Sequence, residues 1–146
     1  MNLTIGGKKY TFVYSVAATL DDDLLETVTN MVKVTQEEEG DSSLAIAGKL
    51  PVLTKALFYG GLLQFHGEFG DGSVKSRKDA DRLLFQYMTE NEGKKEASLI
   101  NIFNALYEQM GDDNFLSRIG MTSEEKKSDK GKKATPTLEV MDGGAN

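Results

Sequence analysis

Few side chains in this sequence could do chemistry. Its one histidine is His66 and it has no cysteine, so thiol–imidazole pairs and histidine-based metal sites are excluded. A serine nucleophile would need a nucleophile elbow, and the sequence shows no such motif. His66 falls at the end of an apolar helical segment, where a favourable interaction with the helix C-terminus is a sufficient reason for its presence.

Two other patterns could bind a ligand. Acidic residues cluster at 21–23, 37–39 and 112–113, but none of the clusters has the spacing of an EF-hand loop. The stretch GEFGDGS, residues 67–73, lacks the spacing and the Lys-Ser/Thr pair of a phosphate-binding loop, and it follows a helix. We therefore predict solvated helix ends and a flexible connector. No catalytic residue, metal site or cofactor is expected, and the chain is predicted not to be an enzyme.

The N-terminal segment is predicted to form a β-hairpin. In LTIGGKKYTFVYS, residues 3–15, large apolar side chains recur at every second position on both sides of a glycine pair that can adopt the positive φ angles of a tight turn. A two-stranded ribbon is marginal in water. We expect Tyr10, Phe12 and Tyr14 to pack on helices of the same chain, and one edge strand to remain available for contact between copies.

Four helices are predicted from the three-to-four spacing of apolar residues. The first covers residues 20–38 behind three aspartates, and the second begins near Pro51 and extends to about His66 as the central helix. A capping box at SRKD, residues 76–79, starts the third helix. The fourth contains Leu99, Ile102, Phe103, Leu106 and Met110 and stops at Gly111, and a final turn uses Phe115, Leu116 and Ile119.

Two glycines lie inside the predicted central helix, at residues 60–61. Each costs about 1 kcal/mol relative to alanine. The preferred explanation is the close approach of another helix backbone, and the second is a kink.

Composition sets the domain organisation and excludes several classes of protein. The 146 residues suit one small domain, residues 1–121, and the charged segment 122–146, which has no aromatic residue, is predicted to be disordered. The net charge of −6 argues against nucleic-acid binding. The sequence shows neither a secretion signal nor an apolar stretch long enough to span a membrane. The expected fold class is mostly α (α+β), with an N-terminal hairpin and about four helices.

The order of these elements resembles a known family. The hairpin LTIGGKKYTFVYS, the acid-led first helix, the apolar helix LPVLTKALFYGGLLQF, the charged helix VKSRKDADRLLFQYMTEN and the helix ASLINIFNALYEQMGDDNF are similar in pattern to the tail assembly chaperones of long-tailed phages and prophages of Gram-positive hosts. The resemblance covers residues 2–118. The loop around residues 40–43 and the connector GEFGDG are longer than expected for the family.

The resemblance implies a non-enzymatic function. Such chaperones bind the tape measure protein in the host cytoplasm, keep it soluble, are displaced as major tail protein polymerises, and are absent from the mature virion. Self-association is implied, and major tail protein is a further candidate partner. Adaptable side chains could cover an apolar helix by helix-in-groove packing or simply fill the core; they are Met31, Met88, Met110, Phe58, Phe65 and Phe103.

The alternative is a small acidic tail-completion or connector protein, or a regulatory adaptor. Mass spectrometry of virions and the neighbouring genes distinguish the two functions. The resemblance also implies a programmed ribosomal frameshift that appends a second domain, and Gly131-Lys132-Lys133 is a candidate slippage site within the tail.

Overall fold

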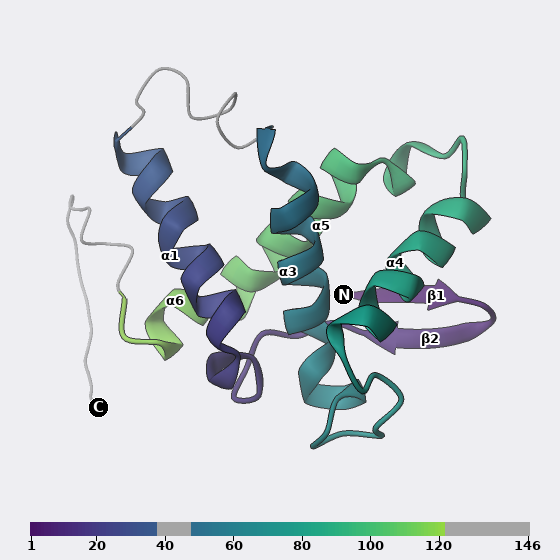
Figure 1. Cartoon of the computed structure of the whole chain (residues 1–146), viewed down its shortest axis with the longest axis horizontal. Coiled ribbons are helices and arrows are strands. Elements are labelled where there is room, and N and C mark those ends of the chain that lie inside the picture. Colours follow the sequence, from purple (N-terminus) through teal and green to yellow (C-terminus); the bar gives the residue numbers. More distant parts are fainter. Residues whose placement is uncertain (38–47, 122–146) are drawn as a thin grey trace. The chain divides into compact units, whose positions relative to one another are not determined.

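A computed structural model describes residues 1–37 and 48–121 of the chain (Figure 1). The chain divides into one compact unit, Met1–Phe115, and a second unit that begins at Leu116. The fold is mostly helical with an N-terminal antiparallel hairpin, which confirms the predicted fold class. The tail 122–146, the candidate slippage site and Glu38 and Glu39 lie outside the described residues.

The elements follow the predicted order. They are strands β1 (Asn2–Ile5) and β2 (Lys8–Thr11), the 3-10 turn η1 (Ala18–Leu20), and helices α1 (Asp22–Glu37), α3 (Leu50–His66), α4 (Arg77–Glu90), α5 (Leu99–Asp112) and α6 (Phe115–Arg118), with a second 3-10 turn η2 (Lys95–Ala97) before α5. The main difference is at the first helix, where Leu20 belongs to η1 and α1 begins at Asp22, because Asp21 caps it by accepting the Leu24 N–H at 3.1 Å.

The hairpin turns at the predicted glycine pair. Gly6 and Gly7 have φ angles of 58° and 81°, as a two-residue turn of type I′ requires. Strand β2 ends at Thr11, earlier than the alternation predicted. The chain nevertheless stays extended, because the Phe12 N–H donates to the Met1 carbonyl at 2.8 Å and the Val13 N–H donates to the Gly61 carbonyl at 2.9 Å.

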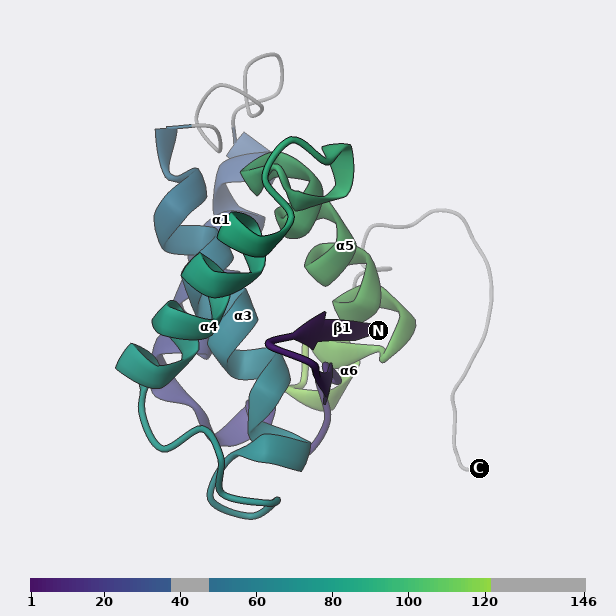
Figure 2. The same cartoon turned by 90° about the vertical axis from the view of Figure 1, so that its right-hand side faces the viewer.

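Helix α3 is the central element. Helices α1, α4 and α5 and strand β2 all pack on it, and buried residues occupy most of its length, namely Leu53, Thr54, Ala56, Leu57, Phe58, Gly60, Gly61, Leu62 and His66. Figure 2 shows β1 in front, with α4 on one side and α5 on the other. The prediction that this segment forms the central helix is therefore confirmed, although Val52 and Phe65 on it are largely exposed.

Side chains, rather than a helix backbone, explain the two glycines of α3. A Cβ at Gly60 would lie 2.6 Å from Cδ2 of Leu24 on α1, and one at Gly61 would lie 3.0 Å from Cδ2 of Phe12 and 3.1 Å from Oη of Tyr14. The predicted approach of another helix backbone is wrong. The glycines make room for one leucine and for the aromatic face of the hairpin segment.

That aromatic face is internal, as predicted. Tyr10 is buried, and Phe12 and Tyr14 are fully buried. The Phe12 ring packs edge-on against Phe58 with centroids 4.8 Å apart, and the Tyr14 hydroxyl donates to the Leu57 carbonyl at 2.6 Å. Burial raises the pKa of Tyr14 well above its ordinary value, so its phenol stays a hydrogen-bond donor.

Serine side chains cap the next two helices. The Ser76 hydroxyl accepts the Asp79 N–H at 3.3 Å, and the Ser98 hydroxyl accepts the Asn101 N–H at 3.4 Å. The predicted capping box at Ser76 is only half formed. The Asp79 carboxylate accepts the Lys75 N–H at 2.9 Å, one residue before the position that a capping box requires.

Phe12→Ala should lower the free energy of unfolding by about 3–5 kcal/mol, because it leaves a cavity between the hairpin and α3. Phe85→Ala is the matched control, since Phe85 is 72% exposed and its truncation should change stability by no more than about 0.5 kcal/mol. Urea denaturation followed by circular dichroism measures both values. Equal effects of the two substitutions would mean that the hairpin does not contribute to the core.

Candidate functional site

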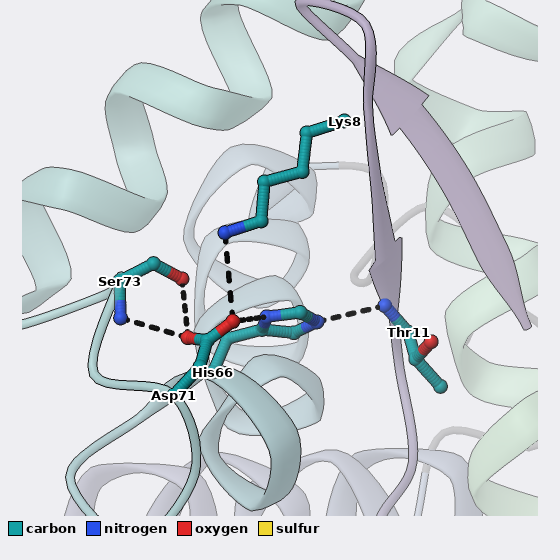
Figure 3. A network of polar contacts seen from close by, with 5 residues as sticks. All are labelled: Lys8, Thr11, His66, Asp71 and Ser73. Carbon is teal, nitrogen blue, oxygen red and sulfur yellow. Dashed lines mark hydrogen bonds and ion pairs between the residues drawn. The ribbon is translucent and has the colours of Figure 1, made fainter.

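A polar network holds the end of α3 against the hairpin (Figure 3). The side chain of His66 is only 8% exposed. Its Nε2 accepts the Thr11 N–H at 3.0 Å, and its Nδ1 lies 3.1 Å from Oδ2 of Asp71. Because Nε2 accepts, the neutral ring carries its proton on Nδ1 and donates it to Asp71. His66 therefore joins β2 to the loop after α3, a role beyond the predicted interaction with the helix C-terminus.

Asp71 organises that loop, residues 67–75. Its Oδ1 accepts the Ser73 N–H at 2.8 Å and the Ser73 hydroxyl at 2.7 Å, and Lys8 Nζ lies 3.5 Å from its Oδ2. The hydrogen bonds from Ser73, followed by the one from His66, hold the pKa of this carboxyl well below its ordinary value. The sequence motif predicted a flexible connector here, but the loop is tied by hydrogen bonds to α3 and the hairpin.

The order of contacts in this network differs from that of a catalytic triad. In a triad the imidazole lies between carboxylate and hydroxyl, so that it can take the proton of the hydroxyl. Here Asp71 lies between His66 and Ser73, and the free nitrogen of the imidazole is occupied by a backbone N–H. The geometry suits holding the loop in place rather than activating Ser73.

The loop forms one wall of an open groove of about 480 Å³. Turn η1 and helix α3 supply the rest, and the lining residues are Ala17, Leu20, Asp21, Tyr59, Leu63, Glu68, Phe69, Gly72, Val74 and Lys75. On the groove's rim, Leu20 is 68% exposed and Phe69 is 71% exposed. We call this surface the η1–α3 groove. Apolar and charged side chains alternate around this groove.

One side of the η1–α3 groove is held by charge pairs. The Arg77 guanidinium lies 4.6 Å from the centroid of the Tyr59 ring, and its Nη2 is 2.7 Å from Oδ1 of Asp21 and 3.0 Å from Oδ2 of Asp23. Partial burial, and then the charge of Asp21, raise the pKa of Tyr59, so the phenol is protonated at neutral pH. Asp21 thus caps α1, and Asp21 and Asp23 pair with Arg77 on α4.

The acidic cluster 112–113 lies at the end of α5 and contacts the hairpin segment. Asp113 accepts the Tyr14 N–H at 2.8 Å and the Gln109 amide at 3.0 Å, so it joins the end of α5 to the hairpin segment. The cluster 37–39 falls mostly outside the described residues. Within the part of the chain that the structure describes, no group of three or more acidic, histidine or cysteine side chains could hold a metal ion.

The side chains singled out as adaptable divide between core and surface. Phe58, Phe103, Met31 and Met110 are buried, and Met88 is partly buried. Of the six only Phe65 is largely exposed, at about half of its surface. Neither Leu20 nor Phe69, on the rim of the η1–α3 groove, was predicted as a binding residue. Phe69 gave the available signal, because a large aromatic residue inside a glycine-rich loop has no helical or strand pattern to explain it.

Comparisons of this chain with protein-family models, with curated proteins and with solved structures find no match. In residues 1–37 and 48–121, no helix is both long enough and apolar enough to cross a membrane.

Asp71→Asn should lower the stability of the protein at neutral pH, because an amide cannot accept the bonds from Ser73 and His66 as a carboxylate does. The native pKa of Asp71 is depressed, so its contribution is complete above the pKa of the unfolded state and is lost as the pH falls toward the native pKa. The difference in melting temperature between wild type and Asp71→Asn should therefore shrink below about pH 4.

Asp112→Asn provides the control, because Asp112 is an exposed acid at the end of α5. Its effect should be small at every pH. A stability difference for Asp71→Asn that stays constant down to pH 2 would contradict the assigned role of the carboxylate.

Proposed function

We propose that this chain is a non-enzymatic phage tail assembly chaperone that binds and solubilises the tape measure protein in the host cytoplasm. Two lines of argument support the proposal. The element order resembles that family along residues 2–118, and the η1–α3 groove offers an open surface with exposed apolar side chains on a protein with a net charge of −6. The groove is the observation that carries the proposal, because it provides a place for an apolar partner.

The groove suits the apolar face of a helix. Leu20 and Phe69 stand on its rim and Leu63 lines it, so that an incoming helix meets apolar side chains from three segments of the chain. Complete burial of Leu20 or Phe69 would contribute about 1.5–3 kcal/mol each. Two such anchors give a moderate affinity, which suits a chaperone that major tail protein must later displace.

Charges around the groove favour an amphipathic partner over a purely apolar one. Asp21 is already paired with Arg77, but Glu68 and Lys75 line the groove with opposite charges. They could pair with side chains at the edge of an incoming helix, and such exposed pairs contribute little energy but set orientation. The main contribution is apolar burial, so the complex should survive moderate salt.

Phe69→Ser should weaken binding of the tape measure protein about tenfold or more, because it removes one apolar anchor. Phe85→Ser is the matched control: Phe85 is equally exposed, at 72% against 71%, but it lies on α4 and does not line the groove. Co-expression with the tape measure protein of the same tail gene cluster, followed by measurement of the soluble fraction, compares the variants with wild type.

Three outcomes of this co-expression are informative. Wild type and Phe85→Ser should bring the tape measure protein into the soluble fraction, and Phe69→Ser should not. If all three proteins bring the tape measure protein into the soluble fraction equally, the groove is not its binding site. A tape measure protein that stays insoluble at every level of wild type would refute the chaperone function itself.

Purified virions should lack this protein, because a chaperone is displaced as the tail tube forms. Quantitative mass spectrometry of particles tests this point, with major tail protein as the internal reference. A fixed copy number in every particle would instead support the alternative function, a small acidic tail-completion or connector protein.

A further inference from the structure

The hairpin has two outer edges, and they differ in how their backbone groups are satisfied. On the β2 side, the Thr11 N–H donates to Nε2 of His66 and the Val13 N–H donates to the Gly61 carbonyl. Lys8 and Lys9 add two positive charges to this strand, a common protection of an exposed edge. The β2 edge is therefore protected by its lysines and by the engaged Thr11 N–H.

The β1 edge is open. Met1 and Phe12 exchange both of their backbone hydrogen bonds, at 2.8 and 3.3 Å. Because such pairs alternate along an antiparallel ladder, Leu3 and Tyr10 form the next exchanging pair, and the N–H and C=O groups of Asn2 and Thr4 point away from β2. Asn2 and Thr4 are exposed, and no hydrogen bond reaches their outward backbone groups from residues 1–37 or 48–121.

A pocket of about 380 Å³ lies beside this open edge. Its lining comes from β1, α4 and the η2–α5 region and includes no residue of β2; the lining residues are Met1, Leu3, Tyr87, Lys95, Glu96, Asn101, Ile102 and Ala105. The pocket therefore continues the inner face of the hairpin beyond β1. It occupies the place where the inward side chains of a third strand would pack.

We propose that β1 pairs with β1 of a second copy of this chain, antiparallel and around a two-fold axis, to give a four-stranded sheet. The outward N–H and C=O groups of Asn2 and Thr4 fix the register of this pairing between copies. Asn2 of each copy exchanges backbone hydrogen bonds with Thr4 of the other, and the axis passes between the two Leu3 residues. The Leu3 pair is a non-hydrogen-bonded pair, in which side chains approach most closely, and both leucines face the apolar pockets.

The absence of charge on β1 makes this edge a place where a second copy can approach. Each chain carries a net charge of −6, so most contacts between copies are repulsive. Strand β1, with the sequence NLTI, has no charged residue, and the rim of the adjacent pocket has one charge of each sign, Lys95 and Glu96. A helical partner could not satisfy the backbone groups of Asn2 and Thr4, because a helix uses its own N–H and C=O groups internally. The inference is independent of the proposed chaperone function.

Thr4→Pro tests the pairing in the full-length protein. Proline at this position removes an outward N–H and leaves the ladder to β2 intact, because Thr4 and Lys9 do not exchange hydrogen bonds. Thr4→Val keeps the N–H and controls for the side chain, and Lys9→Pro makes the same backbone change on β2. Analytical ultracentrifugation over a concentration series measures association, and circular dichroism checks that the helices remain folded.

We expect wild type, Thr4→Val and Lys9→Pro to dimerise, and Thr4→Pro to raise the dissociation constant at least tenfold without loss of helix. A wild-type protein that is monomeric at every concentration overturns the proposal. So does a folded Thr4→Pro variant that dimerises as wild type does, an outcome that would favour another surface for self-association.

Cysteine cross-linking gives a second test that does not depend on how Thr4→Pro folds. The chain has no cysteine, so Leu3→Cys introduces a single thiol at the two-fold axis, and non-hydrogen-bonded pairs have the Cβ spacing that a disulfide needs. With copper–phenanthroline as oxidant, Leu3→Cys should cross-link to a covalent dimer and Lys9→Cys, on the opposite strand, should not. Equal cross-linking of both variants, or none at Leu3→Cys, contradicts the pairing.

Discussion

The burial of one almost uniformly apolar helix is the constraint on which the rest of this structure depends. Helix α3 cannot present a polar face to water, so α1, α4, α5 and the hairpin all pack on it. The two glycines at residues 60–61 let Leu24 and the hairpin aromatics approach its axis closely. The small hairpin is stable for the same reason, because its inner face completes the cover of α3.

A hydrogen-bond network at His66, the last residue of α3, supports the candidate binding surface. The imidazole joins Thr11 of the hairpin to Asp71 of the following loop, and Asp71 in turn fixes Ser73. This network holds in place the loop that contributes Phe69 to the η1–α3 groove. Folding therefore leaves apolar side chains exposed on a loop that is itself held firmly, an arrangement that is costly for an isolated protein and useful for one that binds an apolar partner.

Local patterns in the sequence were enough to predict the hairpin, the four main helices and the inward face of Tyr10, Phe12 and Tyr14, because period-2 and three-to-four spacings depend on near neighbours. They were not enough for contacts between distant residues. The pairing of His66 with Thr11 spans 55 positions, and the packing of Leu24 on Gly60 depends on how two helices meet. The groove could not be predicted for the same reason. Leu20 and Phe69 become part of one surface only when the loop folds back on α3.

In our proposal, an apolar helical partner binds in the η1–α3 groove, and the buried helical stripes serve only the core. The most direct measurement is a titration of the isotopically labelled full-length protein with a soluble helical segment of the tape measure protein, followed by backbone amide chemical shifts. The largest shift changes are expected at residues 17–21 and 68–75, with little change around Phe85 on α4. Changes confined to Phe85 or to the β1 edge, or no change at saturating segment, would contradict it.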